Sequence, residues 1–171
     1  MTKKSAGLLL FREVSGRLEV LLVHPGGPFW AKKDEGAWSI PKGEFEDNEE
    51  PLAAARREFE EETGFTPDGE MVPLKPLRQP SGKLVYAWAM KGDLDPAGLR
   101  SNPFLLEWPR KSGQYREFPE IDRAAWFTIE AAGRKILKGQ AAFLVQLQEK
   151  LGNPRPLPEE GGGTAGSLRE L

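Results

Sequence analysis

The chain has 171 residues, 39% of them hydrophobic, which suits one globular domain with a core of its own. Its 24 Lys and Arg residues and 26 Asp and Glu residues leave a formal net charge of −2, which excludes a general attraction to nucleic acid or to an anionic membrane. Since the chain has no cysteine, disulfides and thiolate metal sites are also excluded.

Two β-strands are predicted at the start of the chain. Residues 5–11 and 18–24 are apolar runs typical of strands, and Ser15-Gly16 between them supplies a turn, so the pattern predicts a β-hairpin. The first apolar run is too short for an export signal, and no stretch reaches transmembrane length. We therefore expect a cytoplasmic protein that does not enter a membrane.

A loop and a short strand are expected next. Residues 25–38 begin with four glycines or prolines and continue with mixed charge, which predicts a mobile surface loop that contains Trp30. Residues 38–41 (WSIP) predict a short strand in which Trp38 is a core residue rather than a ligand. The single histidine, His24, stands at a strand end, and we expect it to be structural or on the surface rather than catalytic.

A helix is predicted over residues 50–63. Pro51 is favoured in a first turn, Gly64 follows where a left-handed residue can end the helix, and Pro67 prevents the helix from resuming. At about 100° per residue, the side chains of this helix divide into two unlike faces. An apolar stripe contains Leu52, Ala55, Phe59 and Thr63, and a carboxylate face contains Glu58, Glu61 and Glu62.

The carboxylate face has a cost in helix stability. Like charges three or four residues apart repel by a few tenths of a kcal/mol per pair, and the dipole at a helix C-terminus prefers cations. Divalent cations would offset this repulsion, because Mg²⁺ and Mn²⁺ prefer oxygen ligands. An acidic face is by itself more typical of a solvated helix, so the residues around it decide between these two interpretations.

Two further strands are predicted in the second half of the chain. Residues 83–90 have little polarity on either face, which is typical of a central strand, and residues 124–129 predict another strand. Residues 106–122 lie between them as a long insertion, and its charges are typical of a solvated loop.

The last part of the chain predicts helices and then a tail. Two helical stretches are interrupted near Lys138-Gly139 and end at Gly152. Residues 153–171 combine prolines with a Gly-rich tract and offer little to bury, so we expect a flexible tail. The predicted domain is therefore residues 1–152.

Residues 43–65, GEFEDNEEPLAAARREFEEETGF, resemble the Nudix box, whose family pattern is G-x5-E-x7-R-E-U-x-E-E-x-G-U with U a bulky apolar residue. Nine residues fill every specified position: Gly43, Glu49, Arg57, Glu58, Phe59, Glu61, Glu62, Gly64 and Phe65. If each of the seven fixed positions is matched by chance at roughly 7%, coincidence is on the order of 10⁻⁸ per window. The order of the predicted elements also resembles the α/β fold of this family, an α/β/α sandwich with a mixed central sheet and a loop-helix-loop catalytic motif.

The resemblance implies hydrolysis of a diphosphate bond in a nucleoside di- or polyphosphate derivative, with Mg²⁺ or Mn²⁺ as the cofactor. It implies four metal-binding groups, which are Glu58, Glu61, Glu62 and the carbonyl of Gly43. The implied catalytic set is Glu49, Arg57, Glu58 and Glu61. Glu49 and Arg57 match positions that help to orient the site, and Glu61 is one candidate for the general base. Three carboxylates outside the box are further candidates for the base, although solvated loop charges explain them equally well: Glu107, Glu117 and Glu120.

Substrate preference is predicted from the segment that leads into the box. The pattern W-x-x-P-K-G at residues 38–43 resembles dinucleoside polyphosphate hydrolases, and Lys42 beside the acidic helix can meet a phosphate. Trp30 and Tyr115 can stack on a base, and Arg110 can bind a distal phosphate, although each of them also fits a plain surface position. A dinucleoside polyphosphate or an NTP is therefore the first expectation, and ADP-ribose or a nucleotide sugar is the second.

Other functions stay open. The chain also resembles a bacterial branch of predicted NTP pyrophosphohydrolases in the Nudix family, which specifies no substrate. A non-catalytic nucleotide sensor is an alternative, but such proteins lose box residues and none is lost here. Removal of pyrophosphate from the 5′ end of RNA is a minor alternative, since the acidic balance leaves only local basic patches. We expect a small-molecule nucleotide as the partner, and a monomer or a homodimer.

Overall fold

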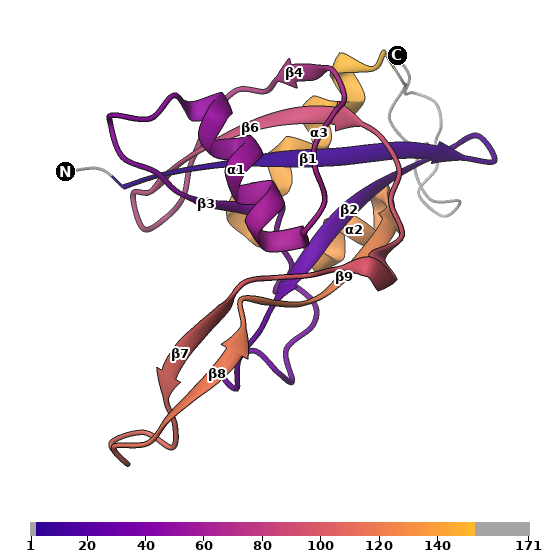
Figure 1. Cartoon of the computed structure of the whole chain (residues 1–171). Coiled ribbons are helices and arrows are strands. Elements are labelled where there is room, and N and C mark those ends of the chain that lie inside the picture. Colours follow the sequence, from indigo (N-terminus) through magenta and orange to yellow (C-terminus); the bar gives the residue numbers. More distant parts are fainter. Residues whose placement is uncertain (1–2, 153–171) are drawn as a thin grey trace.

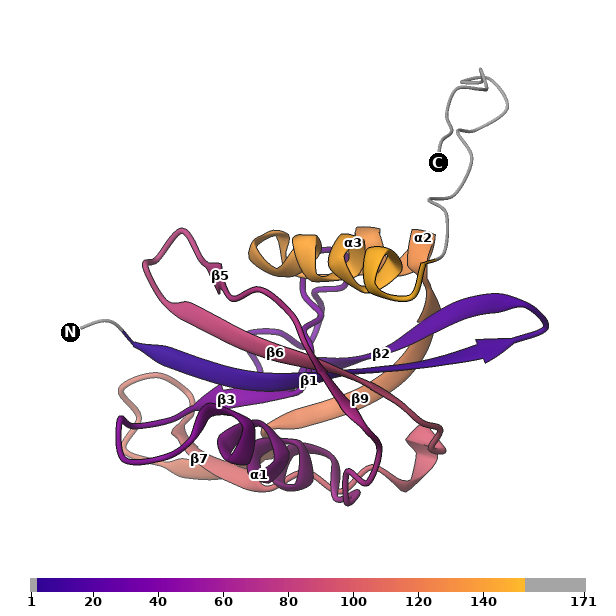
Figure 2. The ribbon, with the colours of Figure 1, turned by 90° about the horizontal axis from the view of Figure 1, so that it is seen from above.

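The computed structural model describes residues 3–152. A mixed seven-stranded sheet separates α1 on one face from α2 and α3 on the other (Figures 1 and 2). The strands of this sheet are β1 (Lys4–Val14), β2 (Arg17–Pro25), β3 (Lys42–Glu44), β4 (Met71–Pro73), β5 (Leu77–Arg78), β6 (Leu84–Lys91) and β9 (Ile121–Thr128). The helices are α1 (Pro51–Thr63), α2 (Ile129–Lys135) and α3 (Ala141–Lys150). The predicted α/β/α sandwich is therefore confirmed.

Strand β1 lies at the centre of the sheet. It pairs antiparallel with β2 and β3 and parallel with β6, and β9 extends the sheet beyond β2. Ser15 and Gly16 both have positive φ angles, of 52° and 79°, which suit the tight turn between β1 and β2. The predicted hairpin is confirmed, and so is the internal position of the strand predicted at residues 83–90.

Alternate side chains of β1 enter two separate cores. Leu8 and Leu10 pack with α1, where Phe59 is 1% exposed. Leu9 points to the opposite face and packs with α3 around Phe143. Truncation of a buried Phe to Ala typically costs about 3–5 kcal/mol, so Phe59 is a main anchor of α1 on the sheet.

Helix α1 begins and ends where the sequence predicts. Pro51 is its first residue, and Gly64 follows it with φ 82° and donates its N–H to the carbonyl of Glu60. The buried residues of the predicted apolar stripe are Ala55, Phe59 and Thr63. Since this stripe lies against the sheet, the carboxylate face is left to the side of the helix that borders β3.

The insertion predicted as a loop at residues 106–122 is part of a two-stranded hairpin, and that prediction was wrong. Its strands are β7 (Pro103–Glu107) and β8 (Tyr115–Pro119), and the hairpin extends away from the sandwich (Figure 1). Phe104 and Phe118 pair across it, with ring centroids 6.1 Å apart. Charged and proline residues within and around the turn obscure the alternation of apolar side chains that would have predicted two strands.

The strand predicted at residues 38–41 is replaced by two isolated bridges, Val23↔Ser39 and Trp38↔Ile136. Because Pro41 has no N–H, this segment cannot continue a regular ladder, and pairing resumes in β3. Trp38 is 4% exposed and belongs to the core, as predicted.

The C-terminal helices follow the prediction. A short 3-10 helix, η2 (Lys138–Gln140), separates α2 from α3 at the predicted interruption. A second one, η1 (Pro96–Gly98), lies between β6 and β7. Among the helices of residues 3–152, none has the length and apolarity needed to cross a bilayer. The predicted tail, residues 153–171, lies outside the described residues, so the domain boundary stays a prediction.

Candidate active site

Strand β3 and helix α1 bring the carboxylates of the box against the backbone. Glu62 reaches back from the last turn of α1, and its Oε1 accepts a hydrogen bond from the backbone N of Lys42 at 3.0 Å. The Glu58 carboxyl lies so close to Gly43 that a Cβ on residue 43 would overlap it. Because glycine carries no Cβ, a carboxylate can lie directly beside the backbone of β3.

Arg57 joins the loop before α1 to the carboxylate face. Its Nε and Nη2 donate to the two carboxylate oxygens of Glu49, at 2.8 and 2.9 Å. Its Nη1 lies 2.7 Å from Oε2 of Glu58 and 3.3 Å from Oε2 of Glu61. A planar guanidinium makes such paired hydrogen bonds in a fixed geometry, so Arg57 orients Glu49, Glu58 and Glu61 together.

Burial disfavours the charged forms of several ionisable groups of the site. Burial raises the pKa of Glu62 to about 8, against the opposing effect of the Lys42 backbone N–H and ammonium. Burial also raises the pKa of Glu58, against the opposing effect of Arg57. Burial and the neighbouring Lys83 lower the pKa of the Lys42 ammonium. A divalent cation would favour the ionised form of these carboxylates, since an opposite charge nearby stabilises it.

Glu120 is the carboxylate outside the box that the structure adds to this cluster. Burial raises the pKa of Glu120, and the nearby charges of Glu58 and Glu61 raise it further. Glu120 also lines the same cavity as Glu62. Its backbone N donates to the carbonyl of Asn102 at 2.9 Å, and the N of Asn102 donates to the carbonyl of Glu61 at 3.1 Å. Asn102 is therefore a backbone bridge between Glu120 and α1, and no local pattern in the sequence indicates it.

The other two external candidates lie elsewhere. Glu107 accepts a hydrogen bond from the N of Gly113 within the β7–β8 hairpin, at 2.8 Å. Glu117 is an exposed residue of β8. The three carboxylates differ in their position along the hairpin. Glu107 and Glu117 belong to its strands, whereas Glu120 lies between the end of β8 and the start of β9, where the hairpin joins the sheet.

A cavity of about 230 Å³ opens beside the carboxylates. Charged side chains line one part of it, namely Lys42, Glu62 and Glu120. Apolar side chains line the rest, including Val23, Trp30, Ile121 and Leu137. These residues come from segments far apart in the sequence. Lys42 and Trp30 could be proposed as binding residues from their local sequence, but no local pattern brings Ile121 or Leu137 to the same cavity. An apolar wall beside charged groups suits a ligand with a base and phosphates.

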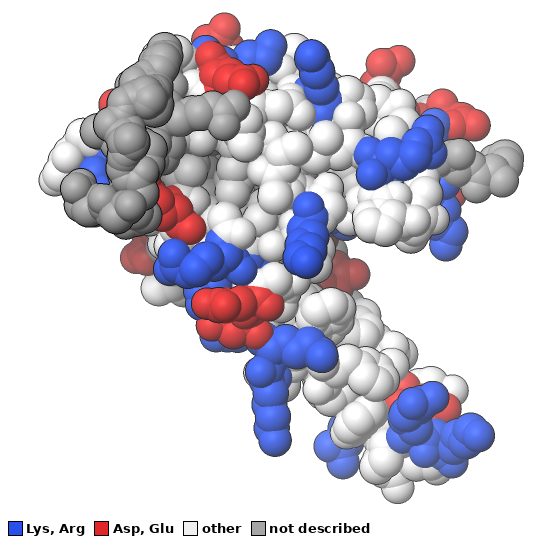
Figure 3. All heavy atoms as spheres, turned by 180° about the vertical axis from the view of Figure 1, so that it is seen from behind, with Lys and Arg blue, Asp and Glu red and all other residues white. Residues whose placement is uncertain are grey.

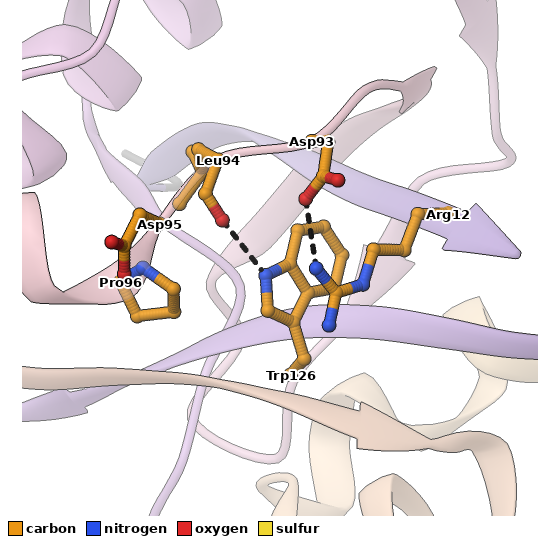
Figure 4. A pocket seen from close by; sticks show the side chains of 6 residues that line it. All are labelled: Arg12, Asp93, Leu94, Asp95, Pro96 and Trp126. Atoms are coloured by element: carbon orange, nitrogen blue, oxygen red, sulfur yellow. Dashed lines mark hydrogen bonds and ion pairs between the residues drawn. The ribbon is translucent and has the colours of Figure 1, made fainter. Parts of the chain in front are cut away.

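A larger, more open cavity of about 550 Å³ lies at another place in the fold (Figure 4). Its polar groups are bonded to one another. The Arg12 guanidinium lies 4.1 Å from the ring centroid of Trp126 and donates to Asp93 at 2.8 Å, and the indole N–H of Trp126 donates to the carbonyl of Leu94. Asp95 accepts from the N of Ala97. We therefore place the candidate site at the smaller cavity.

Two of the predicted substrate-binding residues are not brought to the smaller cavity. Arg110 lies in the turn of the β7–β8 hairpin, and Tyr115 is 65% exposed on β8. The hairpin carries them away from the sandwich (Figure 1), and Figure 3 shows Lys and Arg side chains gathered at its free end. Lys42 and Trp30, in contrast, both line the cavity.

His24 is structural, which is one of the two predicted alternatives. It is fully buried, its Nδ1 lies 2.9 Å from Oδ1 of Asp122, and its Nε2 donates to the carbonyl of Lys33 at 2.7 Å. These contacts fasten the loop that contains Trp30 to the end of β2. His24 thus supports one wall of the cavity without entering it.

The donor set of the cluster fits a hard divalent cation. The carboxyl groups of Glu58 and Glu62 lie beside β3, and the missing Cβ of Gly43 leaves room for Glu58. Within residues 3–152, no three His, Asp or Glu side chains are already arranged to enclose a metal ion. Glu58 and Glu61 are instead turned to Arg57. A rotation of these side chains would be needed to bring their oxygens around one ion.

Among related proteins, an RNA pyrophosphohydrolase of Bartonella henselae is 36% identical over 67 residues, which are 37% of this chain and 36% of that protein. An 8-oxo-(d)GTP phosphatase of Mycolicibacterium smegmatis is 28% identical over 142 residues, 77% of this chain and 36% of that protein. The chain thus spans less than half the length of the curated relatives that it matches.

Solved structures share the fold. An Ap4A hydrolase of Caenorhabditis elegans, in a binary complex, matches with a TM-score of 0.61 at 22% identity, over 86% of this chain and 98% of that one. The NUDIX domain of Shewanella oneidensis NrtR, complexed with ADP ribose, matches with a TM-score of 0.62 at 16% identity, over 88% of this chain and 89% of that one. The NUDIX domain family model matches residues 1–147. With the box intact on β3 and α1, the chain belongs to the NUDIX domain family.

Proposed function

We propose that this protein hydrolyses a diphosphate bond in a nucleoside di- or polyphosphate derivative, with Mg²⁺ or Mn²⁺ as its cofactor. The observation that carries the proposal is the carboxylate cluster of Glu58, Glu61, Glu62 and Glu120 beside a cavity with an apolar wall. Glu58, Glu61, Glu62 and the Gly43 carbonyl would hold the cation. When bound, the cation neutralises phosphate charge and lowers the pKa of water.

The residues of the chain have separate tasks in this proposal. The Lys42 ammonium, beside the cluster, binds a phosphate oxygen of the substrate. Glu61 and Glu120 are the candidates to accept the proton of the attacking water, whose oxygen bonds to phosphorus as the bridging P–O bond breaks. Arg57 and Glu49 hold the carboxylates in place. Trp30 covers the base, and the apolar wall excludes water from it.

A dinucleoside polyphosphate or an NTP is our first choice of substrate. A bis(5′-nucleosyl)-tetraphosphatase of Caenorhabditis elegans is 35% identical over 66 residues, 39% of this chain and 44% of that protein, and the 8-oxo-(d)GTP phosphatase supports the NTP class. ADP-ribose is the second choice, supported by the ligand of the NrtR domain. The intact box argues against a sensor without turnover. Cytoplasmic location and a monomer or homodimer stay predictions.

A substrate panel tests this proposal. Diadenosine tetraphosphate, dNTPs, ADP-ribose and triphosphorylated RNA are incubated with Mg²⁺, Mn²⁺ or EDTA, and the products are separated by chromatography. We expect metal-dependent cleavage, with ATP and AMP formed from diadenosine tetraphosphate. Glu61→Gln and Glu62→Gln keep the side-chain shape and remove charge, so both should lose most turnover. Glu60→Gln is the matched control, because Glu60 is exposed on the same helix.

Two results would reject the proposal. Cleavage that persists undiminished in EDTA would contradict the role of a cation. Full turnover in both Glu61→Gln and Glu62→Gln would contradict the assignment of the cluster as the site. Metal-dependent cleavage of another compound of the panel would keep the reaction and change the substrate.

A further inference from the structure

Gln140 lies at the end of η2 and is fully buried. Both polar atoms of its side-chain amide bind a segment about one hundred residues earlier in the chain. Oε1 accepts a hydrogen bond from the backbone N of Ile40 at 3.0 Å, and Nε2 donates to Oγ of Ser39 at 3.0 Å. A buried polar side chain is tolerated when it is hydrogen-bonded, and both polar atoms of this amide have a partner.

The Gln140 amide supplies a partner that the sheet does not supply. Ser39 exchanges two backbone hydrogen bonds with Val23, at 2.8 and 3.0 Å, and the carbonyl of Pro41 accepts from the N of Leu8 at 3.2 Å. The backbone N of Ile40, between these two anchor points, bonds the Gln140 side chain instead. The amide oxygen thus accepts the hydrogen bond that a backbone carbonyl would accept from Ile40 in a continuous strand pairing.

The orientation of this amide is fixed by its partners. Its oxygen must face the Ile40 N–H, so its nitrogen must face Ser39. The Ser39 hydroxyl accepts from that nitrogen and donates its own hydrogen to the carbonyl of Ile40 at 2.7 Å. In this set the Ile40 N–H, one N–H of the Gln140 amide and the Ser39 hydroxyl each have an acceptor. Loss of the amide would leave the buried Ile40 N–H without a partner.

The segment held by Gln140 leads directly into the candidate active site. Ser39 and Ile40 line the smaller cavity. After Pro41, whose ring restricts the backbone, come Lys42, whose N bonds Glu62, and Gly43, which touches Glu58. A displacement at Ile40 is therefore passed on to the groups that would hold the phosphate and the cation.

We propose that Gln140 is a positioning residue of the active site, a role that rests on the proposed hydrolase function. It fixes Ser39 and Ile40 so that β3 stands at the distance from α1 that the carboxylates require. The layer of helices on the far side of the sheet from α1 then contributes to turnover through one side chain. A merely structural role would lower stability and leave the kinetics of the folded enzyme unchanged.

Three variants test this role. Gln140→Met has a similar length and makes neither hydrogen bond, whereas Gln140→Glu keeps an acceptor for the Ile40 N–H. Gln146→Met is the matched control on α3, because the Gln146 amide bonds the backbone N and carbonyl of Lys75, which do not line the cavity. The measurements are kcat, KM and the half-saturating Mg²⁺ concentration, well below the melting temperature of each variant.

We expect Gln140→Met to lower kcat about tenfold or more and to raise the half-saturating Mg²⁺ concentration, because small misplacements of catalytic groups are costly. Gln140→Glu should recover most of kcat. Gln146→Met should lower the melting temperature only. Wild-type kinetics in Gln140→Met would overturn the proposal, whatever its stability.

Two further measurements keep the test decisive. If Gln140→Met does not fold, Ser39→Ala replaces it, and a kcat and a Mg²⁺ requirement equal to those of wild type in that variant would overturn the proposal. If the wild-type protein turns over no substrate of the panel, the proposed function is rejected, and the role of Gln140 needs a test that does not depend on turnover. Calorimetric titration with Mn²⁺ then tests Gln140 alone: weaker binding in Gln140→Met supports the positioning role, and equal binding overturns it.

Discussion

The Glu58 carboxyl occupies the space in which a side chain on residue 43 would begin. The two residues come from different elements, Gly43 from β3 and Glu58 from α1, so the missing side chain of Gly43 lets the carboxyl of a helix residue lie directly against the strand. The clash from an added Cβ would fall on the far end of a flexible side chain, which can rotate away.

Gly43→Ala should therefore separate activity from stability. We expect turnover to fall about a hundredfold, because the Glu58 carboxylate is displaced from the cluster, while the melting temperature changes by only a few degrees. Steady-state kinetics and thermal denaturation of the same preparation measure both effects. A large loss of stability with normal turnover would contradict this interpretation of the glycine.

Arg57→Lys should show the value of the paired hydrogen bonds. Lysine keeps the positive charge but cannot donate in parallel to both oxygens of Glu49 while it also contacts Glu58. We expect kcat to fall about tenfold or more and the Mg²⁺ requirement to rise. The control is Arg56→Lys, because Arg56 is the neighbouring residue. Within residues 3–152 its side chain makes only one long hydrogen bond, to the carbonyl of Pro67 at 3.4 Å. An equal effect of both substitutions would contradict a specific role for the paired hydrogen bonds of Arg57.

Glu62 should make the metal-free protein less stable as the pH rises. Its pKa is about 8 in the folded protein and has an ordinary value of 4.5, so the folded state binds this proton more tightly than the unfolded chain. The unfavourable contribution therefore grows between pH 4.5 and pH 8. In EDTA at pH 8, Glu62→Gln should be more stable than wild type by up to about 4 kcal/mol, and near pH 4.5 the two should be nearly equal. Urea unfolding at several pH values measures the difference.

Trp30 and Tyr115 should differ in their effect on substrate binding. Trp30 lines the smaller cavity, whereas Tyr115 lies out on the hairpin. Loss of a stacked aromatic ring costs about 1–3 kcal/mol per base, so Trp30→Ala should raise KM for the nucleotide about tenfold. Tyr115→Ala should leave KM unchanged in the same assay. An equal rise in both variants would indicate that the hairpin folds over the bound substrate.

The box residues could be predicted because their chemistry is local. Gly43 lies in β3, and Glu58 and Glu62 lie in α1, where their spacing fixes that they share a face of the helix. The limits of α1 were equally local, since Pro51 and Gly64 act on their own backbone.

The rest of the site depends on geometry that spacing does not contain. Glu107, Glu117 and Glu120 have the same chemistry, and only the hairpin decides that Glu120 joins the cluster. Arg110 and Tyr115 were predicted to bind the substrate, but they lie on the hairpin formed by β7 and β8, which extends away from the sandwich and from the smaller cavity. Gln140 gave no signal at all, because its partners lie about one hundred residues away in the chain.

The parallel pairing of β1 with β6 has a consequence for how the protein folds. In that register Lys4 pairs with Leu84. The sheet surface on which α1 packs therefore forms only after the chain between β1 and β6 has folded back to bring the two strands together. Closing such a loop is slow because its entropy is lost before its contacts form. The carboxylate cluster should then be assembled after the rate-limiting step of folding. Mg²⁺ should accordingly slow unfolding and leave the refolding rate unchanged, which stopped-flow experiments with and without EDTA can measure.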